Sequence, residues 1–528
     1  MVTSRTPCVQ PTVVAPEEMH PKTDILRYPV SLALNPGTLL FLLVCTFIVL
    51  TPSIDLIPVI GRYDEKRLLE CLLLLFAGFS LILLPAVRDD WIRLANQLPL
   101  THRRLLACLI TLGLLSALLA TAPGRALLDV SLYLLLFIAC LHLAIQRHHL
   151  GHHFDKIVAY ALLLTSAFSL TSFAAAYTAA NIEPVPLLHW DLFGNFSHIR
   201  FFSQFQSWTL PLIVLPLLLS SRPAGIRLWL PLLLAGGWWF LLFASGTRGT
   251  LLGLIVAGVI TAFAYGRRAL PWFKWQGLAL LIGLTCYALL ILLPPLLTVA
   301  DTSAIQDGTL GRSLTHSSGR FHLWQVAGSM IAQHPLLGVG PMHYACGVTN
   351  GIAAHPHNAV LQIAAEWGLP AALIVIYLVF SGIQAWIRLG RTRLQATPTT
   401  VAAGFGQDQG TPHAMLFPAL LASLTTAATH ALFSGVINMP LSQVSMVLVI
   451  GWMLGLYFTS APAPASTPTT TKDRAIWMTV ILAACIGLLA GIVPDLMNFG
   501  ELLNNAHVPP GATLFMPRFW QQGLICGG

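Results

Sequence analysis

Charged residues are scarce in this chain of 528 residues, because Asp, Glu, Lys and Arg together make up only 9% of it. Soluble domains carry about 25% charged residues, so the composition excludes a soluble globular protein. Hydrophobic residues supply 56% of the sequence, and its mean hydropathy is +0.74. The net charge of +8 forms no soluble basic face, so nucleic-acid binding is not expected. The composition predicts a membrane protein.

Metal-binding and disulfide patterns are also missing. The nine cysteines are scattered, mostly inside apolar runs, with no CxxC pair and no Cys/His ligand spacing. We therefore expect no metal site, no cofactor and no disulfide scaffold. Cys346 and Cys526 are exceptions, since both lie outside the apolar runs and could pair if both face an oxidising compartment.

Apolar runs of about 20 residues, the length of a helix that spans hydrocarbon, recur along the chain. They predict an all-α polytopic membrane protein with about 12–14 transmembrane helices, roughly nine in residues 36–300 and roughly four in residues 367–494. The runs are 38–60, 68–87, 105–122, 126–145, 157–180, 208–221, 228–245, 250–266, 277–299, 367–387, 414–433, 441–460 and 475–494.

Lys and Arg residues in the loops indicate how these helices are oriented. If residues 1–35 form a cytoplasmic tail and the loops alternate, 19 of the 28 basic residues lie on the inner side and nine on the outer side. Residues 1–35 are polar and lack the apolar core of a signal peptide. The same alternation places the long segment 301–366 and the tail 495–528 on the outer side.

Polar chemistry concentrates in this long outer segment. Gly319 and Arg320 are followed by a Gly-rich turn at residues 338–341 and by a His-Pro-His-Asn cluster at residues 355–358. An apolar helix follows at once and contains a lone acid, Glu366. Ionisable groups set against a membrane helix are typical of functional sites.

Basic residues on the outer side need a reason other than membrane orientation. Those of segment 62–67 stand beside acidic residues and are expected to form a solvated surface turn. Arg200, Arg248 and Arg320 each lie at the outer edge of an expected helix, and Gln204 belongs to the amide-rich stretch around Arg200. Guanidinium groups bind phosphate through paired hydrogen bonds, so this set favours a lipid-linked diphosphate. The alternative is that each arginine reaches toward lipid headgroups from a helix end.

Histidines supply the other candidate groups. His355 and His357 directly precede the helix that carries Glu366, and a histidine of near-neutral pKa suits proton transfer from a hydroxyl group. Asn358 is a candidate either for substrate binding or for capping that helix. A metal site formed by the two histidines is the weaker alternative, because no carboxylate or cysteine stands at ligand spacing.

Two further ionisable groups lie in apolar surroundings. Glu366 is a candidate second base or orienting acid, and its alternative is a carboxylate at a helix end. His430 falls inside an apolar run, which makes it a functional candidate. Its alternative is a hydrogen bond between helices.

The sequence HNAVLQIAAEWGLP, which begins at His357, resembles the signature of the bacterial O-antigen ligase and O-antigen polymerase superfamily. His357, Asn358 and Gly368 fit the signature, and Ala371 departs from it at the last position. GRFHLW and HPLLGVGPMHY upstream resemble the large periplasmic loop of the superfamily. SGTRG at residues 245–249 resembles its arginine-bearing helix junction.

Two other stretches narrow the resemblance. NFSHIRFFSQFQ at residues 195–206 and HALFSGVINMPLSQ at residues 430–443 look most like the branch of type IV pilin O-glycosyltransferases, which are O-oligosaccharyltransferases. The resemblance implies a GT-C-like fold in the bacterial inner membrane, with residues 301–366 as a periplasmic catalytic loop and residues 495–528 as a periplasmic tail.

The implied reaction is a metal-independent, inverting glycosyl transfer. The donor is a glycan on undecaprenyl diphosphate, held among membrane lipids, and the acceptor is a hydroxyl of pilin or of lipid A core. By position, His357, Arg248 and Arg320 match the catalytic residues of the superfamily. Substrate binding is assigned to Arg200, Gln204, His355, Asn358, Glu366 and His430.

Other functions remain open from the residues alone. An O-antigen polymerase shares the donor chemistry and differs in its acceptor. A non-enzymatic transporter of lipid-linked glycan needs polar groups at mid-bilayer depth or on both faces, whereas the candidates here cluster on the outer side. A membrane scaffold needs no outward-facing histidine cluster.

Overall fold

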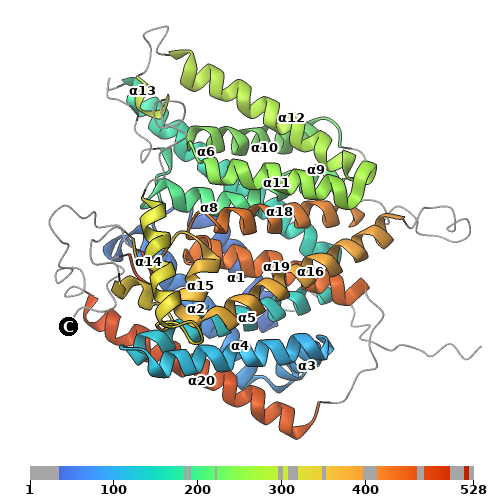
Figure 1. The fold of residues 1–528 in the computed structure, drawn as a ribbon. Coiled ribbons are helices and arrows are strands. Elements are labelled where there is room, and N and C mark those ends of the chain that lie inside the picture. Colours follow the sequence, from blue (N-terminus) through green and yellow to red (C-terminus); the bar gives the residue numbers. More distant parts are fainter. Residues whose placement is uncertain are drawn as a thin grey trace, which may run out of the picture.

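The computed structural model describes residues 35–182, 187, 192–220, 223–294, 301–306, 319–347, 353–395, 413–460, 469–499 and 517–521. Within these ranges the regular structure is entirely helical, which confirms the predicted all-α polytopic membrane protein (Figure 1). Cys526 and all of the predicted cytoplasmic tail except Asn35 lie outside the described residues.

The longer helices follow one another in this order: α1 (Pro36–Leu50), α2 (Arg62–Leu83), α3 (Pro85–Gln97), α4 (Leu100–Leu119), α5 (Pro123–Leu150), α6 (His152–Ile182), α8 (Ile199–Thr209), α10 (Ile226–Ala244), α11 (Arg248–Tyr265), α12 (Leu270–Tyr287), α14 (Arg320–Gln333), α15 (Ala359–Trp367), α16 (Leu369–Gln395), α18 (Leu416–Ala431), α19 (Pro440–Ser460) and α20 (Thr471–Met497). The short elements are η1 (Pro58–Ile60), η2 (Leu210–Leu212), α9 (Leu215–Leu218), η3 (Gly266–Ala269), η4 (Ala288–Leu292), α13 (Ser303–Gln306) and η7 (His343–Gly347).

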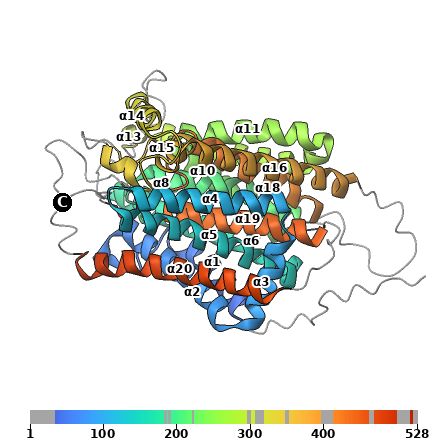
Figure 2. The ribbon, with the colours of Figure 1, turned by 60° about the horizontal axis from the view of Figure 1, so that its bottom comes forward.

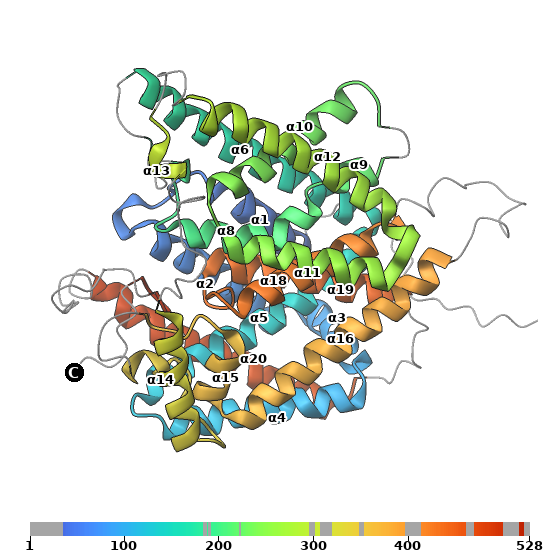
Figure 3. The ribbon, with the colours of Figure 1, turned by 45° about the horizontal axis from the view of Figure 1, so that its top comes forward.

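Nine helical segments of the described chain are long and apolar enough to cross a membrane, or ten if α2 and α3, which meet at 104°, count as one bent span. The other expected spans are the shorter apolar helices α1 and α18, and α12, which joins α11 in one helical segment of 45 residues. Gly266, at φ +55°, caps α11, and Figure 3 shows the chain turning there before α12. Each predicted apolar run therefore overlaps a helix.

The central helix is α5, which packs against α19, α20, α2 and α4. Glycines bring its neighbours close, as small residues do between membrane helices. A Cβ atom on Gly451 of α19 would lie 2.7 Å from the carbonyl oxygen of Cys140, and one on Gly455 would lie 2.6 Å from Cβ of Arg147. Gly491 of α20 meets α5 in the same way.

The two ends of the bundle differ. Helices α13, α14 and α15 lie at one end, the left end in Figure 1, whereas α3 and the end of α16 lie at the other (Figure 1 and Figure 2). We call the end with α14 and α15 the outer end. The helices α10, α11 and α12 form one flank of the molecule, and α3, α4 and α20 form the opposite flank (Figure 1).

The prediction of a solvated turn at residues 62–67 is wrong for all but Arg62, which is exposed. These residues form the first turns of α2, where Lys66 is 4% exposed and Arg67 is 1% exposed. Lys66 Nζ donates to the carbonyl oxygen of Asn195 at 2.6 Å, and Arg67 Nε donates to that of Phe519 at 3.0 Å. Distant segments cover these charges, so the acidic neighbours in the sequence did not reveal their burial.

Candidate functional site

The His-Pro-His-Asn cluster forms a tight turn that leads into α15. His357 has φ +53°, a backbone conformation that costs about 1–3 kcal/mol for a residue other than glycine and is common at functional sites. Its backbone N–H donates to Nδ1 of His355 at 3.2 Å, and the two rings meet edge to face with centroids 4.3 Å apart. Asn358 caps α15, because its side-chain oxygen accepts from the N–H of Leu361 at 3.0 Å. The capping role proposed for Asn358 is therefore confirmed.

Two elements hold this turn from outside. Trp324 of α14 donates its indole N–H to the carbonyl oxygen of Pro356 at 3.1 Å. On the other side, Gly435 lies against the ring of His355, where a Cβ atom would stand 2.5 Å from Cε1. The turn is thus fixed between α14 and the loop that follows α18.

Positively charged residues surround the histidines. Arg200 lies in the first turn of α8, where its backbone N–H donates to Nδ1 of the capping His198 at 3.0 Å. Arg320 begins α14 directly after Gly319, which adopts φ +75°. Both guanidinium-bearing residues are half-buried, and both act electrostatically on His357.

The electrostatic consequence is a neutral histidine pair. Burial and the neighbouring His355 hold the pKa of His357 well below its usual range, and the charges of Arg200 and Arg320 lower it further. Burial also lowers the pKa of His355 to about 3, with smaller effects from Arg518 and Arg200. Both rings are therefore uncharged at neutral pH and can accept a proton or a hydrogen bond.

His430 lies at the end of α18 and links it to two other helices. Its Nδ1 lies 2.8 Å from Oγ of Ser207 on α8 and 3.4 Å from Oγ1 of Thr250 on α11. A Cβ atom on Gly249 would stand 2.6 Å from this ring, so glycine allows the start of α11 to approach. The interhelical hydrogen bond considered for His430 is confirmed. The adjacent Arg248, first residue of α11, is exposed.

Gln204 lies one turn into α8 and is buried. Its Nε2 donates to Oγ of Ser434 at 2.7 Å, whereas its Oε1 has no hydrogen-bond partner among the described residues. A buried amide oxygen without a partner is uncommon in folded proteins. The side chain therefore keeps one acceptor available next to the loop that holds His355.

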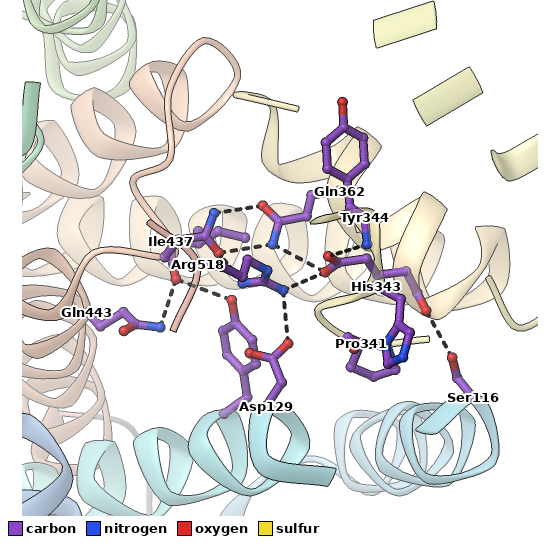
Figure 4. Close-up of polar contacts among 12 residues, drawn as sticks. Ser116, Asp129, Pro341, His343, Tyr344, Gln362, Ile437, Gln443 and Arg518 are labelled. Carbon is purple, nitrogen blue, oxygen red and sulfur yellow. Dashed lines mark hydrogen bonds and ion pairs between the residues drawn. The ribbon is translucent and has the colours of Figure 1, made fainter. Parts of the chain in front are cut away.

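Glu366 lies apart from the histidines. It is 1% exposed and sits about 10 Å further along the axis of α15 than the start of that helix. Its Oε2 forms an ion pair with Nη2 of Arg518 at 2.6 Å, and its Oε1 accepts the backbone N–H of Tyr344 at 3.2 Å (Figure 4). The carboxylate thus faces Arg518 and η7.

Sequence reasoning missed Arg518 and Asp129, the two other charged members of this buried cluster. Asp129 carried a usable signal, because an acid inside the apolar run 126–145 is unusual in a membrane helix. Arg518 carried none, since it lies in a short tail without a recognisable motif. Neither residue is exposed by more than 3%.

The structure therefore brings His355, His357, Arg200 and Arg320 together, with His430 and Arg248 beside them, and it places Glu366 in a separate cluster. Residues 231–376 match the family model described as O-antigen ligase. That range contains Arg248, Arg320 and His357. No curated protein matches the chain. The family match supports the O-antigen ligase and polymerase superfamily and a glycosyltransferase-type enzyme in a membrane.

Proposed function

We propose that this protein transfers a glycan from undecaprenyl diphosphate to an acceptor hydroxyl at the periplasmic face of the bacterial inner membrane. The observation that carries the proposal is the meeting of Arg200 and Arg320 around His357 at the outer end of the bundle. The family match, which covers two of these three residues, supports the same chemistry.

The arginines bind the diphosphate of the donor. Arg248 and Arg320 are the first residues of α11 and α14, so the positive end of each helix dipole adds to the positive field. Guanidinium groups suit phosphate oxygens because they donate in pairs within a plane. The polyprenyl tail of the donor lies in the membrane, against the apolar helices next to this end.

The transfer is a single displacement with inversion at the sugar. The acceptor oxygen forms a bond to C1 while the bond between C1 and the phosphate oxygen breaks. The proton of the acceptor hydroxyl passes to His357, and the bonding electron pair stays on the diphosphate. The products are the glycosylated acceptor and undecaprenyl diphosphate, and the arginines stabilise the negative charge that develops there.

The low pKa of His357 makes the base depend on the donor. In the empty site the ring is neutral but is a weak base, because burial and then the nearby positively charged groups lower its pKa. A bound diphosphate brings negative charge that offsets those cations and raises the pKa of His357. The base therefore gains strength when the donor is in place, and His355, hydrogen-bonded to the backbone of His357, orients it.

Two observations support the periplasmic assignment. Cys346, which lies in η7 of the outer segment, is disulfide-bonded, and structural disulfides persist in oxidising compartments. The excess of Lys and Arg in the loops at the opposite end favours a cytoplasmic location for that end. The pairing of Cys346 with Cys526 stays a prediction, because Cys526 is not among the described residues.

The acceptor is a hydroxyl of pilin or of lipid A core. The stretches at residues 195–206 and 430–443 favour pilin, and Gln204 of the first donates to Ser434 of the second. Arg200 of the first acts electrostatically on His357, and Gly435 of the second lies against the ring of His355. Side chains from these two stretches therefore stand where an acceptor would approach His357. We propose that this pair of stretches selects the acceptor.

The test is glycan transfer by the purified protein from a lipid-linked donor, with and without EDTA. Pilin and lipid A core are offered separately, and wild type is compared with His357→Ala, Arg248→Ala and the control Arg388→Ala. Arg388 is exposed and lies near the end of α16, at the opposite end of the bundle. We expect transfer to one acceptor, unaffected by EDTA, to fall about 10²–10⁴-fold in His357→Ala and about 10²–10³-fold in Arg248→Ala, and to be retained in the control.

Other outcomes would replace the proposal. Lengthening of the glycan on the lipid carrier, with neither acceptor modified, would indicate a polymerase. Movement of the donor across a vesicle membrane without a covalent product would indicate a transporter. Full transfer by His357→Ala would overturn the assignment of the base.

A further inference from the structure

The buried residue Arg518 connects segments that are far apart in the chain. Its Nη2 donates to Oε2 of Glu366 at 2.6 Å and to Oδ2 of Asp129 at 3.1 Å, and its Nη1 donates to Oδ1 of Asn438 at 2.7 Å (Figure 4). These partners belong to α15, to α5 and to the loop before α19. One guanidinium group therefore joins the outer segment to two parts of the membrane bundle.

The C-terminal end of α15, where Glu366 lies, also binds the Gly-rich turn at residues 338–341. The backbone N–H of Gly340 donates to the carbonyl oxygen of Glu366 at 3.0 Å, and Oγ of Ser116 on α4 donates to the same oxygen at 2.9 Å. The side chain of Glu366 holds the N–H of Tyr344 at 3.2 Å. Glu366 thus ties α15 to the turn, to α4 and to Arg518.

Neighbours of Arg518 in the chain are also fixed. Phe519 lies under the guanidinium group of Arg67, 5.0 Å from its ring centroid, and Trp520 donates its indole N–H to Asp495 at 2.7 Å. The backbone N–H of Gln521 donates to Asp64 at 2.7 Å. We call residues 517–521 the C-terminal clasp, since they contact α2 and α20 while Arg518 reaches α5 and α15.

The charges in this cluster make Arg518 difficult to replace. It is the only cation that any described contact gives to Asp129 or Glu366, and both carboxylates are at most 2% exposed. Removing one partner of a buried ion pair leaves an uncompensated charge and is strongly unfavourable. The two acids therefore hold Arg518 in one place, and Arg518 in turn holds α15.

We propose that Arg518 is a positioning residue: by clamping α15 to α5, it fixes the turn that presents His357 to the acceptor. The link is the rigidity of α15, which begins one residue after Asn358 and carries Glu366 near its other end. The inference rests on the proposed transfer reaction for its effect on rate, and on the contacts above for its effect on structure.

The test compares Arg518→Met and Arg518→Lys with the control Arg474→Met, which breaks a partly exposed ion pair with Asp89 elsewhere in the molecule. Lysine keeps the charge but cannot hold three acceptors in the plane of a guanidinium group, so Arg518→Lys is expected to fold. We expect kcat to fall about 10²-fold in Arg518→Met and less in Arg518→Lys, because a misplacement of about 1 Å has that effect. The donor KM should stay within about twofold, because the arginines that bind the diphosphate are not displaced.

Two further readouts separate positioning from loss of structure. In a His357→Ala background, Arg518→Lys should lower the residual rate little, because its effect acts through His357. Hydrogen exchange of residues 338–344 and 359–367 should be faster in both Arg518 variants than in wild type and unchanged in Arg474→Met. Additive effects on the rate, or wild-type exchange of both segments, would overturn the proposal.

The exchange measurement also separates this inference from the proposed function. If wild type transfers no glycan while exchange rises in the Arg518 variants, the role of Arg518 in holding α15 is supported and the proposed reaction is not. If wild type transfers glycan and exchange is unchanged, the reaction stands and the clamp fails.

Discussion

The two ends of α15 carry ionisable clusters of opposite character. At its start, His357 is half-buried in a strained turn among half-buried or exposed arginines. Near its end, Glu366 is fully buried, and its partner Arg518 makes three short hydrogen bonds to protein groups. The first cluster contains several arginines. The second contains one buried arginine, Arg518, together with the two acids that pair with it.

This difference separates a cluster that we propose binds a ligand from one whose ion pairs lie inside the protein. Clustered cations near the surface favour the binding of an anion, and Arg200 and Arg320 both act electrostatically on His357. The Arg518 cluster offers less capacity, because both terminal nitrogens of its guanidinium group already donate to protein groups, and Nε alone of the three has no partner among the described residues. Under the two proposals above, the ionisable groups serve binding at one end of α15 and rigidity at the other.

The largest expected effect comes from removing a positive charge beside His357, at the start of α15. Arg320→Ala should lower the rate of glycan transfer about 10²–10³-fold, as removal of a group that stabilises developing charge does in other enzymes. The measurement is kcat with saturating acceptor, with Arg388→Ala as the control for a lost surface charge. A rate within about threefold of wild type would mean that Arg320 serves lipid headgroups, which was the alternative for the outer arginines.

The next effect concerns Gly368, which ends α15 next to the Glu366–Arg518 cluster. It has φ +90°, and a Cβ atom there would lie 2.1 Å from the carbonyl oxygen of Leu336. Gly368→Ala should lower the free energy of unfolding by at least about 1–3 kcal/mol from backbone strain alone. The matched control is Gly382→Ala in α16, where nothing lies within 4 Å of the added methyl group.

The measurement is the midpoint of thermal unfolding in detergent, followed by transfer activity. Gly382→Ala should be neutral or slightly stabilising, because alanine favours a helix more than glycine does. Equal midpoints for the two variants would show that the end of α15 is free to move, and the contrast between its two ends would lose its basis.

The pH dependence of transfer tests the field around His357. Because the pKa of that residue lies well below its usual range, kcat/KM should stay flat from about pH 8 to about pH 6 and fall only at lower pH. Arg200→Ala removes a positive charge, which raises the pKa of His357 and moves this fall to higher pH. Arg388→Ala should leave the profile in place. An unmoved profile in Arg200→Ala would mean that Arg200 does not act on the base.

The sequence was sufficient for the membrane helices because hydropathy over 20 residues is a local property. The run 126–145, for example, lies within α5, which spans Pro123–Leu150. It was insufficient for α3, where Pro85 starts a polar helix bent by 104° from α2, and for the buried charges of Lys66 and Arg67. Those outcomes depend on which segments cover a residue.

The site divides in the same way. His357 and Asn358 could be predicted from their neighbours in the chain, because a turn and a helix cap are local. Arg518 could not, since its partners Asp129 and Glu366 lie 389 and 152 positions away. Glu366 illustrates this limit: a lone acid after two histidines suggests a base, whereas its ion pair with Arg518 could not be predicted from its neighbours in the chain.

The smallest expected effect concerns Asn358, the residue between His357 and the first residue of α15. Asn358→Ala removes the N-cap of α15 and should lower the free energy of unfolding by about 0.5–2 kcal/mol, with a modest loss of transfer. Asn358→Ser should restore both, because a serine hydroxyl also accepts from the backbone at a helix start. The measurements are the unfolding midpoint and kcat. If serine restores the midpoint but not kcat, the amide of Asn358 contacts substrate as well as capping the helix, and the cluster around His357 extends to the N-cap of α15.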